Sequence, residues 1–130
     1  MNQPAAVFNL DSTYLHLPDG PAMSPVPVDE KFWAEINSRQ DLQDGRLVTL
    51  LRCSEDWGNW EMHPAGDELV YLLNGAVDLI LEQPDGEAVI ELRDRAACVM
   101  PAGVWHRAIV HQPSNLLHIT RGAGTEHRPV

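Results

Sequence analysis

The stretch that decides the fold covers residues 61–75 and reads Glu61-Met-His63-Pro-Ala-Gly-Asp67-Glu68-Leu-Val-Tyr-Leu-Leu-Asn74-Gly75. It begins with two metal-ligand residue types, Glu61 and His63, which point to the same side of a strand because side chains alternate. Pro64-Ala-Gly66 is a turn signal, and an apolar run follows it. That run ends at Asn-Gly, which is the strongest short signal for a β-hairpin. We therefore expect strands over 68–73 and 76–82, joined by a turn at 74–75.

The expected hairpin assigns the side chains of both strands to faces, because cross-strand partners share a face. Pairing across a two-residue loop places Leu72 opposite Val77 and Val70 opposite Leu79. One face then carries Glu68, Val70, Leu72, Val77, Leu79 and Leu81. A carboxylate on an otherwise apolar face needs a partner. The pattern thus selects Glu68, rather than Asp67, as the inward-facing acid.

The remainder of the chain predicts many short strands and one helix. The helix is expected over Asp29 to Ser38, with Asp29 as its cap and a packing stripe of Phe32, Trp33 and Ile36. An edge strand is expected at 13–18, with His16 on its solvent side. Further strands are expected at 47–53, 60–63, 88–92, 96–100, 105–111 and 116–120. Short strands with turn signals at near-regular spacing predict an all-β sandwich or jelly-roll barrel.

Composition excludes several function classes. The 130 residues fit one domain, and 44% of them are hydrophobic. The formal net charge is −10, from 19 acidic and 9 basic residues. An acidic surface repels phosphate backbones and anionic lipids, so we expect no nucleic-acid or membrane partner. The N-terminus has no basic region before an apolar core, so we expect no signal peptide and a cytoplasmic location.

A second cluster of candidate ligands lies about thirty residues after the first. Pro101-Ala-Gly103 is another turn signal, and His106 follows it. Strand alternation places Trp105, Arg107 and His111 on the face opposite His106. Each signal alone is weak, since a lone His after a turn is commonly a hydrogen-bonded surface residue. Two turn-linked clusters of ligand types are a stronger indication that distant strands meet at one site.

Other polar and aromatic candidates rank lower. His118 could line the cavity or be a hydrogen-bonded core residue, and His127 is expected to be exposed in an extended tail. Trp57 and Trp60 could stack on a ligand or cover the barrel end. Cys53 and Cys98 could form a disulfide or bind metal, but two small buried residues in strands is the favoured interpretation.

Residues 61–75 and 101–106 resemble the two sequence motifs of the cupin superfamily. In place of the first motif's HxH, the chain has Glu61 and His63, followed after four residues by Glu68 and after six more by Gly75. Pro101, Gly103 and His106 match the second motif, whose frequent final Asn is Val110 here. Both motif-opening glycines are replaced, by Glu55 and Arg95. The resemblance spans residues 47–120 and implies a double-stranded β-helix (jelly-roll, cupin) barrel with one short N-terminal helix.

The resemblance also implies a divalent metal ion inside the barrel, held by Glu61, His63, Glu68 and His106. Two histidines and two carboxylates would replace the usual three histidines and one glutamate. This harder set favours Fe(II) or Mn(II), with Zn(II) and Ni(II) as alternatives. A metal would also remove the penalty of placing two carboxylates in an apolar interior. The competing interpretation is a barrel in which Glu61 points to solvent and no metal binds.

The function expected from these features is that of a metal-dependent small-molecule enzyme of dioxygenase, isomerase or decarboxylase type. Glu61 is either a ligand or a general base beside the metal. The alternatives are a barrel that binds a small molecule without turnover and a metal-free structural barrel. We expect an N-terminal arm and helix (1–46) packing on the barrel (47–121), and a tail (122–130), in one domain. The arm, with sheet residues Tyr71, Ile80 and Ile109, predicts a homodimer.

Overall fold

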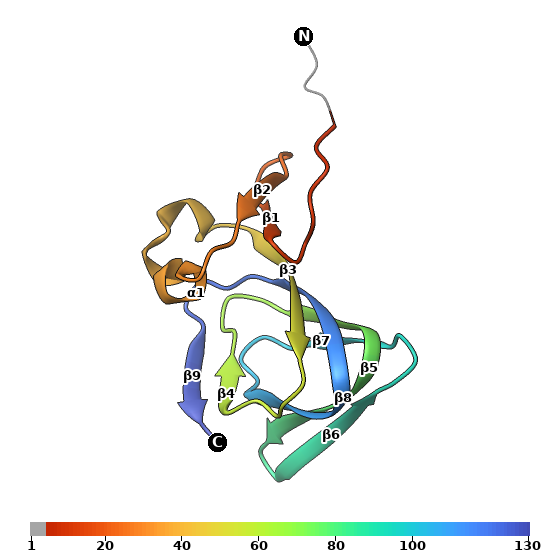
Figure 1. The fold of residues 1–130 in the computed structure, drawn as a ribbon. Coiled ribbons are helices and arrows are strands. Elements are labelled where there is room, and N and C mark those ends of the chain that lie inside the picture. Colours follow the sequence, from red (N-terminus) through yellow and green to blue (C-terminus); the bar gives the residue numbers. More distant parts are fainter. Residues whose placement is uncertain (1–4) are drawn as a thin grey trace.

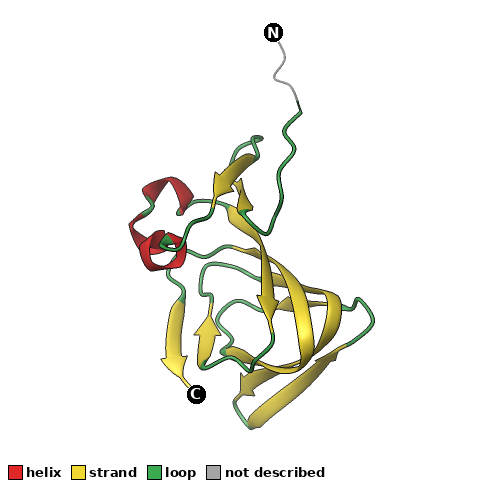
Figure 2. Cartoon of the chain, viewed as in Figure 1, coloured by secondary structure: helices red, strands yellow, loops and turns green. Residues whose placement is uncertain are grey.

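The computed structural model describes residues 5–130, and residues 1–4 of the predicted arm lie outside them. Strands make up most of the regular structure of the described chain, which has one short α-helix, as predicted (Figure 2). The elements in chain order are β1 (Thr13–Leu17), β2 (Ser24–Pro27), α1 (Phe32–Glu35), the 3₁₀ turns η1 (Ile36–Ser38) and η2 (Gln40–Leu42), β3 (Arg46–Cys53), β4 (Asn59–Met62), β5 (Glu68–Gln83), β6 (Gly86–Leu92), β7 (Ala97–Met100), β8 (His106–Thr120) and β9 (Glu126–Pro129).

Two long strands, β5 and β8, organise the barrel (Figure 1). They pair antiparallel from Leu69 opposite Ile119 to Leu81 opposite His106. The other edge of β8 pairs with β3 in its second half and with β4 at His106. The sheet continues from β3 to β1 and β2, and from β4 to β9. β6 and β7 pair with the two halves of β5. The N-terminal strands are thus hydrogen-bonded to the same sheet as the barrel.

The predicted hairpin at Asn74-Gly75 is wrong. Residues 68–83 form the single strand β5, which crosses β8 with register shifts between Leu72 and Val77. Gly75 has φ of 103°, and the register shift between Asn74 and Ala76 shows that it forms a bulge instead of a turn. The hairpin lies further on, where Gln83 pairs with Gly86 across a turn at Pro84 and Asp85. Strand β8 likewise joins the two predicted strands at 105–111 and 116–120, and its Pro113 is unpaired opposite the bulge.

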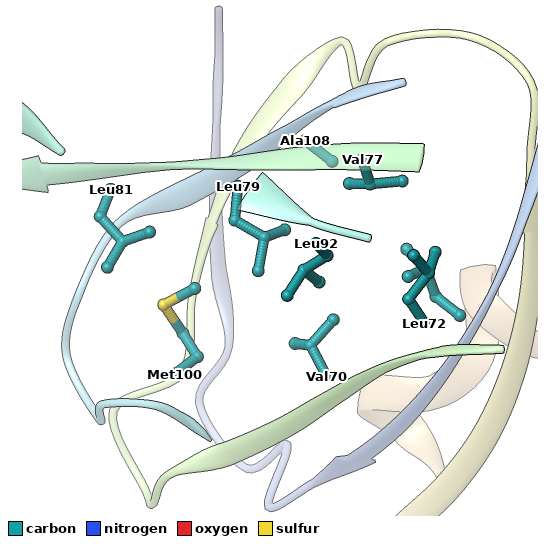
Figure 3. Close-up of a cluster of buried hydrophobic side chains, with 9 residues drawn as sticks. Val70, Leu72, Val77, Leu79, Leu81, Leu92, Met100 and Ala108 are labelled. Carbon is teal, nitrogen blue, oxygen red and sulfur yellow. The ribbon is translucent and has the colours of Figure 1, made fainter. Parts of the chain in front are cut away.

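The predicted inward face is nonetheless confirmed. The bulge changes the alternation of β5 by one residue, as a two-residue loop would have done. All six residues assigned to that face are buried: Glu68, Val70, Leu72, Val77, Leu79 and Leu81. The five apolar ones pack with Leu92, Met100, Ala108 and Leu116 to form the barrel core (Figure 3). Asp67 is exposed, and its carboxylate accepts a hydrogen bond from the backbone N–H of Ala102.

The predicted helix at 29–38 is much shorter in the structure. Only residues 32–35 are α-helical, the N-cap is Lys31 and not Asp29, and the chain continues in the 3₁₀ turns η1 and η2. Asp29 Oδ1 accepts from the N–H of Lys31, and the hydroxyl of Ser38 donates to the carbonyl of Glu35. Phe32 is buried, but Trp33 is 50% exposed, so the predicted packing stripe is incomplete.

Three further expectations are corrected or settled. His16 is buried, not solvent-facing, because the loop before β3 covers it and the Asp44 carbonyl lies 2.8 Å from its Nε2. The predicted tail contains β9, which pairs with β4. Cys53 and Cys98 are both free and half-buried against the core. None of the helices in residues 5–130 is long and apolar enough to cross a membrane.

Candidate metal centre

The register of three neighbouring strands assembles one end of the site. On β4, Glu61 lies directly opposite His106 of β8 and directly opposite His127 of β9. Directly opposed residues share a face, so the three side chains converge. His63 follows β4 by one residue, on the same side as Glu61. Its carbonyl accepts a hydrogen bond from the N–H of Gly103, which joins the two predicted motifs.

Three of the predicted ligands form a compact group. One donor atom each from Glu61, His63 and His106 lies within 4.8 Å of the other two. Both histidines are buried, while the side chain of Glu61 is 24% exposed. Glu61 therefore faces the interior, not bulk solvent. This observation disfavours the interpretation in which Glu61 points outward.

The fourth predicted residue, Glu68, lies among three histidines. Its carboxylate oxygens are 3.1 Å from His63 Nε2, 3.5 Å from His106 Nε2 and 3.5 Å from His118 Nδ1. Burial raises the pKa of Glu68, but the contacts with these histidines outweigh it and hold the pKa well below 4.5. The hydroxyl of Thr120 donates a further hydrogen bond to Oε2. Glu68 is thus ionised although it is buried.

The proton positions on the two candidate ligand histidines, His63 and His106, can be inferred from their partners. His106 Nδ1 lies 3.0 Å from the Val104 carbonyl, which only accepts, so Nδ1 carries the proton. The Thr125 hydroxyl donates to the Gly122 carbonyl, so it accepts a hydrogen bond from His63 Nδ1–H at 2.8 Å. In the neutral ring, each Nε2 then offers a lone pair to the site, whereas in the protonated ring it donates to Glu68 and so lowers the pKa of that carboxylate.

The residues present fit a divalent cation. The Nε2 atoms of His63 and His106 and one oxygen of Glu68 are buried without a hydrogen-bond partner. Such atoms are costly in a folded interior unless something binds them. A hydrogen bond that fixes the second ring nitrogen is the usual support of a metal-binding histidine. Burial lowers the pKa of His63, but the Glu68 and Glu61 carboxylates outweigh it and raise the pKa above 6.5, so a proton competes with a cation for this ring.

Three further residues lie at the cluster: His118, which the sequence ranked below the four candidates, and Thr120 and Thr125, which it did not indicate. His118 is buried beside Glu68, and its position on β8 differs from that of His106 by an even number of residues, which places both on one face. The same parity applies to Thr120. Thr125 lies in a loop, where no strand periodicity indicates its direction.

The remaining candidates lie outside the cluster. His111 is bound to Asp78 at 2.8 Å on the outer surface. Trp60 is covered by the guanidinium groups of Arg107 and Arg128, so it belongs to the outer face of the sheet. Trp57 packs on the core, with its ring 6.3 Å from that of His106, as expected for a residue that covers the barrel end.

A cavity of about 460 Å³ opens beside the cluster. Glu61, His63, Glu68 and His118 line one part of it, together with His127. His127 is 58% exposed, as predicted, yet its Nε2 lies 3.6 Å from Glu61 Oε1. The volume falls within the range of about 300–1,000 Å³ that is typical of small-molecule sites.

Comparison with known proteins identifies the fold as that of the cupin barrels. No protein-family model and no curated protein sequence matches the chain. Among solved structures, a Neisseria meningitidis protein is 24% identical over 58% of this chain and 74% of its own, with a TM-score of 0.51. A cupin-2 domain protein from Shewanella frigidimarina is 19% identical over 57% and 68%, with a TM-score of 0.50.

An enzyme is also among the similar structures. A mutant oxalate decarboxylase from Bacillus subtilis is 13% identical over 65% of this chain, with a TM-score of 0.52. The match covers only 24% of that enzyme. At these identities the likeness shows the fold alone.

Proposed function

We propose that this chain, which has the cupin fold, binds one divalent metal ion at Glu61, His63, Glu68 and His106 and acts as a metal-dependent small-molecule enzyme. The observation that carries the proposal is the convergence of two buried, unpartnered histidine Nε2 atoms on Glu61, within 4.8 Å. Glu68 contacts both histidines and completes a set of two neutral and two anionic ligands. Two carboxylates would balance the charge of a divalent cation.

The ligand chemistry favours Fe(II) or Mn(II), and Zn(II) and Ni(II) are alternatives. When bound, the metal supplies a Lewis acid that holds substrate oxygens or activates dioxygen. The reaction class we propose is therefore oxidation by dioxygen, isomerisation or decarboxylation. Each needs an open cavity beside the site, and the 460 Å³ cavity provides one.

Glu61 is the residue that we propose for proton transfer. It is the most exposed of the four, and it reaches both the ligand cluster and His127. A carboxylate at the edge of a cavity can accept a proton from a bound molecule, and a neighbouring imidazole can pass it on. If Glu61 ligates through one oxygen, the other remains free for this role.

The second candidate is a barrel that binds a small molecule without turnover. Few groups on the cavity wall could transfer a proton, because Glu61 and His127 are the only partly exposed titratable groups that line it among residues 5–130. This scarcity supports binding without turnover. Turnover of a substrate that stops on chelation and returns with metal distinguishes the enzyme from the binding protein. The cytoplasmic location and the homodimer stay predictions, although Ile80 is only 7% exposed within one chain and offers little to a partner.

The metal proposal is tested by elemental analysis of the purified protein and of two histidine variants. We expect about one divalent metal per chain in the unmodified protein. His106→Ala should lose it, and His111→Ala should keep it, because His111 lies on the outer surface beside Asp78. Absence of metal, together with no thermal stabilisation by Fe(II), Mn(II), Zn(II) or Ni(II), would overturn the proposal.

A further inference from the structure

The cavity beside the candidate metal centre has a second half of different character. From the candidate ligands Glu61, His63 and Glu68, the cavity extends to the helical segment between β2 and β3 and to the inner face of β3. Figure 1 shows α1 on the same side of the molecule as β4 and the chain entering β9. The apolar side chains that line this half are Trp33, Ile36, Leu42, Leu47 and Leu51. The predicted helix thus contributes a cavity wall as well as core packing.

The apolar half is formed by regular structure. Strand alternation places Leu47, Thr49 and Leu51 on one face of β3, and Thr49 between the two leucines is buried. Ile36 and Leu42 come from the two 3₁₀ turns and pack against the cluster of Tyr14, Val26 and Phe32. The rings of Trp33 and Phe32 meet edge to face at 5.0 Å.

The charge of the cavity wall is the second observation. Among residues 5–130, neither Lys nor Arg lines the cavity. The polar groups of the apolar half are neutral ones, such as Asn37, Gln43 and Thr49. The side-chain N–H groups of Gln43 already donate to the carbonyls of Ile36 and Arg39. An anionic group placed here would lose its hydration without gaining a cationic partner.

Resting on the proposed metal site, we infer that the ligand is a small molecule with two chemically distinct ends. One end carries oxygen donors and lies at the cluster of Glu61, His63 and Glu68. The other is an uncharged apolar body of aromatic or branched aliphatic type, which packs on Trp33, Ile36 and Leu47. Trp33 is a specificity-determining residue, because its 50% exposed ring is apolar surface that such a body would cover.

The inference can be tested with two probes that differ only at the remote end. The probes 4-tert-butylcatechol and 3,4-dihydroxybenzoate share two oxygen donors, and they carry an apolar group or a carboxylate at the same ring position. Titration calorimetry on the Zn(II)-loaded protein avoids redox chemistry. We expect the tert-butyl probe to bind about tenfold more tightly, given the area it buries and the unpaired carboxylate of its counterpart.

Two variants and a control locate the effect in the apolar half. Trp33→Ala should weaken the tert-butyl probe about fivefold and leave the metal content unchanged. Ile36→Lys should reverse the preference, so that 3,4-dihydroxybenzoate binds more tightly than the tert-butyl probe. Because a misfolded variant would not gain affinity for a probe, this result cannot come from misfolding. Val89→Lys is the control, because Val89 is 55% exposed on β6, away from the cavity. Equal or tighter binding of 3,4-dihydroxybenzoate to metal-loaded protein would overturn the inference and leave the metal proposal standing.

A protein that takes up no metal would overturn the proposed function, and the cavity is then tested separately. The metal-free protein is titrated with 4-tert-butylphenol and 4-hydroxybenzoate. A preference for the apolar probe that Trp33→Ala removes supports the inference. Binding of neither probe, or equal binding of both, overturns it.

Discussion

Gly75 of β5 lies in direct contact with Ser114 of β8, at the point where β5 bends across its partner. A Cβ added to Gly75 would fall 2.1 Å from Ser114 Oγ and 2.7 Å from Ser114 Cα. The same hydroxyl accepts a hydrogen bond from the N–H of Ala76 and donates one to the carbonyl of Gln112. This contact holds the bulge that lets one continuous strand present Glu68 and Leu79 to the same interior.

The first prediction is that Gly75→Ala strongly destabilises the protein. The added methyl meets backbone as well as side chain, and φ of 103° strains any residue with a Cβ. Together these effects should lower the free energy of unfolding by about 3 kcal/mol. Urea denaturation measures it.

The matched control for this variant is Gly86→Ala. Gly86 has φ of 135° but nothing within 4 Å of an added Cβ, so it carries the backbone strain without the clash. We expect a loss of about 1 kcal/mol there. Equal losses at both positions would show that the contact with Ser114 adds nothing.

The inward face of β5 could be predicted from sequence, although its topology could not. Alternation identifies which side chains share a face, and a hairpin and a bulge shift that alternation equally. Choosing between them depends on what lies opposite Gly75, and that is Ser114, 39 positions later in the chain. Local turn chemistry carries no information about this partner.

The site shows the same division between local and distant information. Side-chain alternation along the strands predicts that Glu61, Glu68 and His106 face the interior, and all three lie within a few residues of the turns at 64–66 and 101–103. The roles of Thr125 and His127 depend on β9 pairing with β4, which a short Gly- and Pro-containing segment does not indicate. His16 was misplaced for a related reason, because the cover over an edge strand comes from another part of the chain.

The second prediction concerns the hydrogen bond that orients His63. Thr125→Val removes the hydroxyl that accepts the hydrogen bond from His63 Nδ1–H, and it keeps the shape of the side chain. If His63 is a ligand, metal affinity should fall about 10- to 100-fold. Competition with a chromophoric chelator measures the change.

Thr125→Ser is the rescue variant, because it restores the hydroxyl without the methyl group. It should retain an affinity close to that of the unmodified protein. Unchanged affinity in Thr125→Val would show that this hydrogen bond does not support metal binding.

The third prediction concerns Arg95, which stands where the cupin motif begins with glycine. Arg95 has φ of 66°, a left-handed conformation that glycine adopts without strain. Arg95→Gly should therefore raise the free energy of unfolding by about 1 kcal/mol. The exposed hydrogen bond from Arg95 to the Tyr71 hydroxyl, at 3.2 Å, is lost in the exchange.

Arg95→Ala separates the two effects in the same thermal-unfolding measurement. It removes the bond to Tyr71 but keeps a Cβ at the strained position, so it should be no more stable than the unmodified protein. If alanine stabilises as much as glycine, the gain comes from removing the side chain and not from relieving the backbone.

The fourth prediction is a pH-dependent contribution from Asp78. The hydrogen bond from His111 lowers the pKa of Asp78 below 3.8, and Arg93 lowers it further. Because the folded state binds the proton less tightly than the unfolded state, this carboxylate stabilises the fold above about pH 3.8. The contribution is lost as the pH falls through the lower, folded pKa. Asp78→Asn should therefore cost about 1 kcal/mol at neutral pH and progressively less in acid.

Urea denaturation of Asp78→Asn and the unmodified protein at a series of pH values tests this sign. Asp85→Asn, in the exposed loop between β5 and β6, controls for removing one negative charge from a chain of net charge −10. The difference between the Asp78 variant and the unmodified protein should shrink below pH 3.8, as the carboxylate takes up its proton in both states. A difference that grows in acid would mean that Asp78 stabilises the protein through its protonated form, contrary to its contacts with His111 and Arg93.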